Sequence, residues 1–435
     1  MQTEKEKGLS IGSSKKKILI KYYYERIRRD VTNFIKWMLL AILTGLVVGG
    51  ASSAFAACIS AATEYRNSHL WVFLCLPLAG IVIVFMYERL GRQDGGTNQV
   101  LSTIKSKDNV PFISAPLIFI STLLTHLTGG SAGREGASIQ FGGSIGSWLA
   151  KLVHLDETDH HVMIMCGMSA AFAAVFGTPM AAAVFSMEVV SVGIMYYAAL
   201  VPCVIASIIA SKFAAGFGIN PESFHVVNIP ELTIETGLKM VLVAVACAAI
   251  SIIFCIALQG VSKLYAKFLK NPYIRIVAAS AIIIVITLFL RTSDYMGAGN
   301  NLIELAVENG QARPLDFFWK LVLTALAMRA GFRGGEIVPS FCIGATFGCI
   351  MGHLIGLSPS ICAAAGMAAL FCGVTNCPIT SILIAFELFG FRGASYYLIA
   401  VSISYAVSGY YGLYKDQTIV YSKYKAKYIN RHTRF

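Results

Sequence analysis

The sequence predicts an all-α polytopic membrane protein with two inverted-topology repeats of broken and tilted helices. Of its 435 residues, 56% are hydrophobic and only 13% are charged, which is too apolar for a domain that exposes a polar surface to water. Apolar runs long enough to cross the roughly 30 Å hydrocarbon core of a bilayer recur along the chain. Glycines and prolines interrupt these runs at corresponding places in the two halves, as in transporters built from repeats.

The apolar segments divide the chain into parts. Segments 33–57 and 71–90 are long enough to be simple spans, and a short, polar, glycine-rich stretch at 91–107 follows them. The later segments of the first half are shorter or broken: 111–127, 141–152, 161–177, 180–195 and 198–217. Segments 233–269 and 274–290 lead into the second half, which continues with 297–307, 314–328, 337–355, 358–372, 379–389 and 394–409. We therefore expect a basic N-terminal segment at 1–32, a first membrane repeat at 33–217, a second membrane repeat at 218–415 and a terminal segment at 416–435.

Three short motifs recur in the same order in both halves. They pair Gly96-Thr97-Asn98 with Gly299-Asn300-Asn301, Gly133-Arg134-Glu135-Gly136 with Gly334-Gly335-Glu336, and Thr178-Pro179-Met180 with Cys377-Pro378-Ile379. The separations between matched positions agree within two residues. If the repeats are inverted, helix N-termini from both halves converge near the middle of the bilayer, and their positive dipole ends select an anion.

The stretch at residues 129–140 is the strongest candidate for a functional site. Arg134 and Glu135 lie there among glycines, between two apolar runs, and ionisable residues in such a place are costly unless they have a function. Glycines allow backbone N–H groups to crowd at the start of the following helix, which favours anion binding. A fixed Glu135 carboxylate would occupy the anion position itself, so we expect Glu135 to move or to take up a proton.

Basic residues gather at the two ends of the chain. They are Lys15, Lys16, Lys17, Lys21, Arg26, Arg28 and Arg29 at one end, and Lys423, Lys425, Lys427, Arg431 and Arg434 at the other. By the positive-inside rule this predicts a multi-pass protein of the cell membrane with both termini in the cytoplasm. The net charge of +12 then mainly reflects the topology of the protein. We expect the lipid bilayer to be a partner of the chain, and we expect no nucleic-acid partner.

The sequence indicates neither a metal site nor a cofactor. Its eleven cysteines lie mostly inside apolar runs and form no CxxC pair with histidine partners, so we interpret them as small buried hydrophobes. The stretch Gly129-Gly130-Ser131-Ala132-Gly133 also matches the GxSxG pattern of hydrolases. An intramembrane serine hydrolase is therefore a remote alternative, although the flanks are helical and the pattern needs a strand–turn–helix or a nearby histidine base.

These motifs resemble those of the CLC family of chloride channels and anion/proton antiporters. Gly133-Arg134-Glu135-Gly136, in its context GGSAGREGASIQFGGSIG, resembles the family's GREGP loop. Gly335-Glu336-Ile337-Val338-Pro339 resembles its GxFxP loop, and GAGNNLIELAV resembles the start of its second repeat. The likeness covers essentially residues 33–421. It implies a homodimer with one pathway per subunit, in which Glu135 is the gating glutamate that swings in and out of the anion path and carries the proton.

Three departures from the family's chloride transporters resemble its fluoride-exporting subfamily instead. The stretch Gly95-Gly96-Thr97-Asn98-Gln99 lacks the serine and the proline of the GSGIP loop, so Thr97 or Asn98 would replace that serine. Alignment on Pro179 places Val189 where chloride exchangers carry an inner proton-transfer glutamate, with Glu188 one position early. Glu336 directly precedes Ile337, as in the GGE(V/I)xP variant of the fluoride exporters.

The resemblance therefore implies a secondary active transporter, not an enzyme, that exports fluoride in exchange for protons and needs no cofactor. Gating and proton coupling are assigned to Glu135 and Glu336. The anion-binding residues are expected to be Gly95, Gly96, Thr97, Asn98, Gly133, Arg134, Gly136, Ile337, Val338 and Tyr421. The alternative is a chloride channel or a chloride/proton exchanger of the same family. Channels of the family also lack the inner glutamate. The distinction between a fluoride exporter and these alternatives therefore depends on Glu336 and on the missing serine.

Three further assignments leave alternatives open. In the family the terminal segment re-enters the membrane edge as a helix and presents a tyrosine to the anion, so 416–435 is expected to form a re-entrant helix and a basic tail. Matching on Tyr-Ser selects Tyr421, with Tyr414 and Tyr424 as alternatives. Glu336 handles a proton or simply caps its helix, where a carboxylate is favourable. Glu188 and Glu387, which occupy matched places, form a structural pair or a proton relay.

Overall fold

The computed structural model describes residues 2–91, 95–106, 110–425 and 427–434. The α-helices of the first half are α1 (Gln2–Ser68), α2 (Leu76–Leu90), α3 (Thr97–Thr103), α4 (Ser114–Leu127), α5 (Glu135–Leu152), α6 (Glu157–Phe176), α7 (Pro179–Glu188) and α8 (Leu200–Gly216). Those of the second half are α9 (Ile234–Phe268), α10 (Pro272–Leu290), α11 (Asn300–Glu308), α12 (Asp316–Ala330), α13 (Ile337–Ile355), α14 (Pro359–Thr375), α15 (Pro378–Phe389) and α16 (Ala394–Val407). Short 3₁₀ turns are η1 (Leu70–Cys75), η2 (Tyr197–Ala199) and η3 (Phe391–Gly393). The predicted helical fold class is confirmed.

The helices differ in their ability to cross a membrane. In the described chain, seven helical segments are long and apolar enough to do so, the first being Leu19–Ser68 within α1 and the last α13. Helices α4, α14 and α15 are apolar but shorter. Short helices inside a membrane protein must end within the packed interior, where other protein groups satisfy their terminal N–H and C=O groups.

The two halves build the same helical unit. Helices α3 to α8 correspond in order to α11 to α16, and α5 packs on α6 as α13 packs on α14. Glycine makes both pairs possible: a Cβ on Gly142 would lie 2.2 Å from the carbonyl oxygen of Gly167, and one on Gly348 would lie 2.2 Å from that of Cys362. Backbone approach through small residues is a common way to join helices in membranes, because dispersion contacts replace the absent hydrophobic force.

Two glutamates join the repeats to each other. At the end of α7, the Glu188 carboxylate accepts hydrogen bonds from the backbone N–H groups of Ile379 (3.1 Å) and Thr380 (2.8 Å) in the first turn of α15. Near the end of α15, Glu387 accepts from the N–H groups of Met180 and Ala181, at 2.9 Å each, in the first turn of α7. Each carboxylate therefore satisfies orphan donors of the other repeat, which favours the structural role of this pair.

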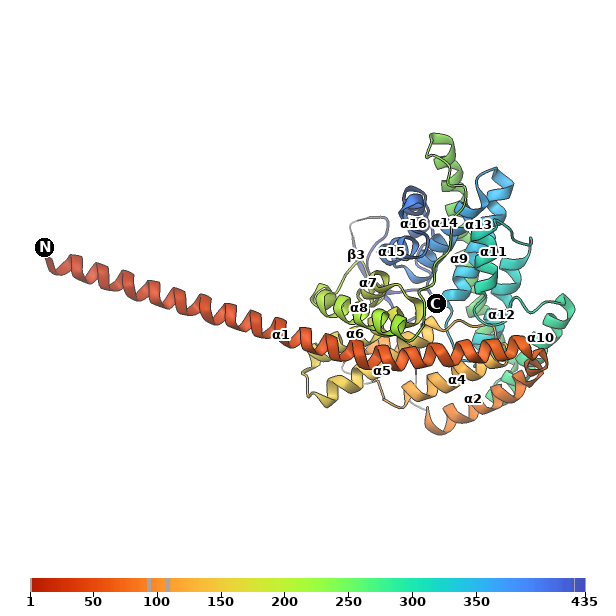
Figure 1. Cartoon of the computed structure of the whole chain (residues 1–435), viewed down its shortest axis with the longest axis horizontal. Coiled ribbons are helices and arrows are strands. Elements are labelled where there is room, and N and C mark those ends of the chain that lie inside the picture. Colours follow the sequence, from red (N-terminus) through yellow and green to blue (C-terminus); the bar gives the residue numbers. More distant parts are fainter. Residues whose placement is uncertain (1, 92–94, 107–109, 426, 435) are drawn as a thin grey trace.

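Helix α1 crosses the predicted boundary between residues 32 and 33 without a break. Figure 1 shows its N-terminal part projecting away from the packed helices, while the rest lies along the body of the protein. The described side chains are exposed up to Ile35, become partly buried from Lys36, and α1 then contacts α4, α6 and α8. The predicted boundary thus marks a change from an exposed to a packed helix.

The terminal segment does not form the expected re-entrant helix. Instead, β1 (Ser191–Val192), β2 (Thr418–Tyr421) and β3 (Tyr428–His432) form a small sheet in the order β1-β2-β3. Strand β2 pairs in parallel with β1, Ser191 opposite Thr418, and antiparallel with β3. The run Thr418-Ile419-Val420-Tyr421 is β-branched and aromatic, which suits a strand, and the chain after α7 offers it an edge to pair with.

Candidate functional site

The two repeated loops meet at the centre of the molecule. The N–H of Gly133 donates to the oxygen of Gly335 at 2.8 Å, and the N–H of Gly335 donates back to the oxygen of Gly133 at 2.7 Å, as an isolated antiparallel bridge. Helix α5 begins two residues after Gly133 and α13 begins two residues after Gly335. The bridge therefore holds the N-termini of two matched helices next to each other, as the repeat predicted.

No side chain fits between these loops. A Cβ on Gly335 would lie 2.5 Å from the nitrogen of Gly136, and a Cβ on Gly136 would lie 2.8 Å from the Cα of Gly335. A Cβ on Gly133 would lie 2.9 Å from a carboxylate oxygen of Glu135. Glycine is needed here because the two backbones touch, and this contact leaves first-turn N–H groups at the junction of the repeats.

Glu135 lies buried at this junction, with 1% of its surface exposed. Its Oε2 accepts a hydrogen bond from the backbone N–H of Arg134 at 3.0 Å, and its Oε1 lies 3.5 Å from Nε of Arg134. It lines neither of the two cavities described below. The carboxylate thus occupies the position between two helix N-termini where an anion would otherwise be stabilised.

Arg134 connects Glu135 to a second carboxylate. Its Nη2 donates to Oε1 of Glu222 at 2.9 Å, and Asn300 donates to the same oxygen at 2.9 Å. Glu222 belongs to the stretch that joins the repeats, and Asn300 begins α11. The Arg134 guanidinium therefore bridges two carboxylates, one at the centre and one outside it.

An inner cavity of about 180 Å³ lies on one side of the Gly133–Gly335 bridge. Both repeats contribute to its wall, which consists of Gly95, Gly96, Thr97, Asn98, Ile118, Gly136, Gln140, Met328, Arg329, Phe332, Arg333, Gly334, Gly335, Glu336, Leu413 and Tyr414. The cavity is small and largely polar, and it has room for a small anion with a few waters.

Thr97 and Asn98 differ in how they use their polar groups at this cavity. The Thr97 hydroxyl donates to the oxygen of Gly136 at 3.3 Å, so its proton is engaged within the protein. The side-chain oxygen of Asn98 is buried and has no hydrogen-bond partner among the described residues. Rotation of the amide would present its NH₂ group at the same place. Of the two residues proposed to replace the serine of chloride transporters, Asn98 is therefore the better donor for an anion.

The inner cavity carries two arginines and one glutamate. Arg329 donates from Nη2 to Oε1 of Glu336 at 2.7 Å, and no capping bond from Glu336 to α13 is present in the described chain. This argues against the capping alternative for Glu336. Arg333 lies over the ring of Tyr87, 3.8 Å from its centroid, and forms no salt bridge with any described residue. The excess positive charge favours an anion in the cavity.

The other predicted ligands lie in different places. Ile337 and Val338 are buried at the start of α13 but line neither cavity, so only their backbone N–H groups at a helix start are suited to anion binding. Tyr421 is 46% exposed and packs beside Gly193 and Tyr428 in the sheet, and Tyr424 is 59% exposed. Tyr414 is the tyrosine on the inner cavity. Tyr421 lies on β2 and lines neither cavity, so the match on Tyr-Ser did not select the tyrosine that faces the inner cavity.

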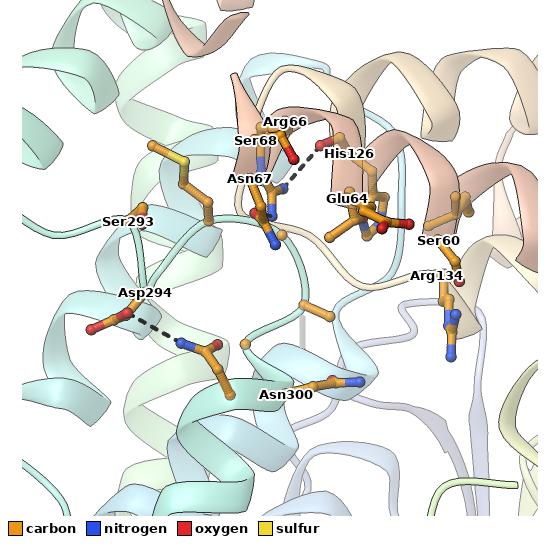
Figure 2. A pocket seen from close by; sticks show the side chains of 17 residues that line it. Ser60, Glu64, Arg66, Asn67, Ser68, His126, Arg134, Ser293, Asp294 and Asn300 are labelled. Atoms are coloured by element: carbon orange, nitrogen blue, oxygen red, sulfur yellow. Dashed lines mark hydrogen bonds between the residues drawn. The ribbon is translucent and has the colours of Figure 1, made fainter. Parts of the chain in front are cut away.

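A second cavity of about 740 Å³, named the outer cavity, is shown in Figure 2. Its wall comes from the end of α1, from His126 and Arg134, and from the stretch before and at the start of α11. Arg66 of α1 donates to the carbonyl oxygen of His126 at 2.9 Å, a contact that Figure 2 marks. Arg134 lines the outer cavity and Gly136 lines the inner one, so Glu135 lies between the two cavities.

Sequence reasoning did not identify several residues at these cavities. Arg329 and Arg333 precede the second-repeat motif within a few residues, and their charge beside an apolar run was the available signal. Glu222 and Arg66 lie far from the motifs in sequence. Only the packing of the repeats brings them to the site.

Fold and site together define a multi-pass membrane transport protein built from inverted repeats. The family model for the voltage-gated chloride channel matches residues 79–409. This chain therefore belongs to the voltage-gated chloride channel, or CLC, family.

One relative and one solved structure, each more than 30% identical to this chain, support the assignment to this family. A protein of Pseudomonas syringae pv. tomato, named a chloride/fluoride channel protein, is 33% identical over 397 residues, covering 89% of this chain and 88% of the relative. The crystal structure of a CLC-type fluoride/proton antiporter has a TM-score of 0.85 and 32% identity, covering 88% of this chain and 98% of that chain. A slow cyanobacterial Cl⁻/H⁺ antiporter shares the fold, with a TM-score of 0.75 at 18% identity.

Proposed function

We propose that this protein is a secondary active transporter that exports fluoride in exchange for protons. The observation that carries the proposal is the position of Glu135, a buried carboxylate at paired helix N-termini between an inner and an outer cavity. When ionised, Glu135 takes the anion position and blocks the path. When protonated, it loses its charge, its hold on Arg134 weakens, and an anion replaces it at the helix ends.

Fluoride as the transported anion is supported by the inner cavity and by the relatives. Fluoride is a small, strong hydrogen-bond acceptor, so it is suited to backbone N–H donors, the Asn98 amide and arginines in a cavity of about 180 Å³. The relatives named above are a chloride/fluoride channel protein and a fluoride/proton antiporter. Relatives with lower identity include H⁺/Cl⁻ exchange transporters, one of them from Vibrio cholerae, and chloride is the alternative substrate.

Glu336 is the second carboxylate in the proposed mechanism. It reaches the inner cavity from the start of α13 and pairs with Arg329, whereas Val189 occupies the position that the family's chloride exchangers use for an inner glutamate. We assign Glu336 to proton transfer between the inner cavity and Glu135. The protein would work in the cell membrane as a homodimer with one pathway per subunit and with both basic termini in the cytoplasm.

The test is ion efflux from liposomes that contain the purified protein. Vesicles loaded with fluoride or with chloride are diluted into a buffer that contains neither halide, while internal and external pH are followed. Fluoride efflux that drives proton uptake, and that stops in Glu135→Gln, is the expected result. Glu304→Gln, an exposed glutamate of α11, is the matched control and should transport normally. Chloride efflux as fast as fluoride efflux and without proton movement would contradict the proposal and indicate a channel.

A further inference from the structure

The wall of the outer cavity contains a buried arginine without a carboxylate partner. Arg66 is only 5% exposed, and it donates to the oxygen of His126 and to Oδ1 of Asn67, each at 2.9 Å. Its Nε is buried and has no hydrogen-bond partner, and no described carboxylate forms a salt bridge with this side chain. An unpaired buried charge costs several kcal/mol, so this arrangement calls for a counter-ion.

A second buried cation lies directly behind Arg66. Lys320 is fully buried and donates from Nζ to the carbonyl oxygens of Tyr295 (3.0 Å) and Gly297 (2.6 Å). On the other side of Gly297, a Cβ would lie 3.2 Å from Nη1 of Arg66. In the described chain Lys320 also has no salt bridge. Lys320 therefore donates to Gly297 while Arg66 lies near the same glycine, and the repulsion between the two positive charges adds to the cost of burial.

His126 adds a third unpaired group to the same wall. It is 2% exposed, lines the cavity, and its Nε2 has no hydrogen-bond partner among the described residues. As Figure 2 shows, Arg66 and His126 lie next to each other in the cavity wall. Arg66 Nε and His126 Nε2 are thus two buried nitrogens of residues in the cavity wall that have no hydrogen-bond partner among the described residues.

No described acidic residue in or near the cavity forms a salt bridge with Arg66. Asp294 is paired with Arg313 at 2.6 Å and also accepts from Asn301. Glu222 is held by Arg134 and Asn300. Glu64 is exposed and lies next to His126 in Figure 2, but it forms no salt bridge with a described residue. Arg66 and Lys320 therefore have no carboxylate partner in the described part of the chain.

We propose that the outer cavity holds a binding site for a small inorganic anion between Arg66 and His126. In naming the transported halide as its occupant, this inference rests on the proposed function. The cavity of about 740 Å³ is large enough for the anion together with its water, so the site attracts the anion by charge and strips little of its hydration. The proposed site and the inner cavity lie on opposite sides of Glu135. An exported anion therefore reaches this site after it has passed the Glu135 carboxylate, and the site then holds the anion away from Glu135.

Binding to the solubilised full-length protein tests the site without relying on transport. Titration calorimetry with sodium fluoride and sodium chloride should detect a class of sites that Arg66→Gln weakens about tenfold. Arg291→Gln, which removes an exposed positive charge before the same stretch, is the matched control and should bind as the parent does. Glu64→Gln leaves Arg66 in place and removes the negative charge at the rim, so it should tighten binding.

Crystals grown with bromide locate the site. An anomalous peak beside Arg66, absent in Arg66→Gln, is expected. Bromide found only in the inner cavity, or equal titration curves for the parent and for Arg66→Gln, would overturn the proposal. Binding that occurs only in Glu64→Gln would also overturn it, because Glu64 would then be the counter-ion of Arg66. Chloride or bromide binding at Arg66 without any fluoride transport would leave the site standing and refute the proposed function instead.

Discussion

Replacement of Gly335 by alanine tests the central contact between the repeats. The new Cβ would lie 2.5 Å from the nitrogen of Gly136 and 3.0 Å from its Cα, and both are backbone atoms that no rotamer change can move. The loops must therefore separate, which breaks the two hydrogen bonds between Gly133 and Gly335. Each bond contributes about 1 kcal/mol and the overpacking costs about 1–3 kcal/mol, so we expect a loss of about 3–5 kcal/mol.

The consequence for transport follows from the same geometry. Because the bridge holds the starts of α5 and α13 together, its loss moves apart the N–H groups that we assign to the anion. We expect at least tenfold slower fluoride efflux from liposomes, together with a lower unfolding temperature in detergent. Both are measured on the same purified sample, so that the transport rate is expressed per folded protein.

Gly260→Ala is the matched control for this substitution. Gly260 lies inside α9, and a Cβ there would meet no atom within 4 Å. Alanine should be neutral or slightly stabilising at this helical position. If Gly335→Ala unfolds and transports like Gly260→Ala, the two loops are not in contact in the working protein, and the reasoning about the site fails.

Three further predictions concern the inner cavity, the glutamate pair and pH. Tyr414→Phe should weaken fluoride binding about tenfold in titrations, since it removes a hydroxyl from the inner cavity, whereas Tyr421→Phe should have no effect. Glu188→Ala should destabilise the protein by about 2–4 kcal/mol in detergent unfolding, because it removes the acceptor for three hydrogen bonds from Ile379 and Thr380. Burial lowers the pKa of Lys423, in the terminal segment, to about 8. The unfolded chain then binds more protons above pH 8, so stability should rise from pH 8 to about pH 10.5, by at most about 3 kcal/mol, and Lys423→Met should remove this rise.

Each of these has a result that would contradict it. Equal fluoride binding in Tyr414→Phe and in the parent would show that the Tyr414 hydroxyl does not act at the inner cavity. Uncoupled fluoride and proton movement in Glu188→Ala would assign Glu188 to the proton path, although it lines neither cavity. The same pH dependence of unfolding in the parent and in Lys423→Met would assign the titration to another group.

Much of the fold could be predicted because it depends on local signals. The apolar segment 337–355 coincides with α13, and the prolines at 179, 359 and 378 each begin a helix. Apolar length and helix-start chemistry are properties of a few consecutive residues, so they can be seen in the sequence. The terminal strands could not be predicted in this way. The run Thr418–Tyr421 becomes a strand because β1, more than 200 residues earlier, provides an edge for it.

The sequence by itself determined where the centre of the site lies, since the motifs around Glu135 and Glu336 recur in both repeats and contain the glycines that their contact requires. Only the tertiary structure decided what surrounds that centre. Tyr414 replaced Tyr421 at the inner cavity, Arg329 reached Glu336, and Arg66 came to lie beside His126. The reason is physical. A repeated motif consists of consecutive residues, whereas the charge balance of a cavity depends on side chains that only the packing of distant helices brings together.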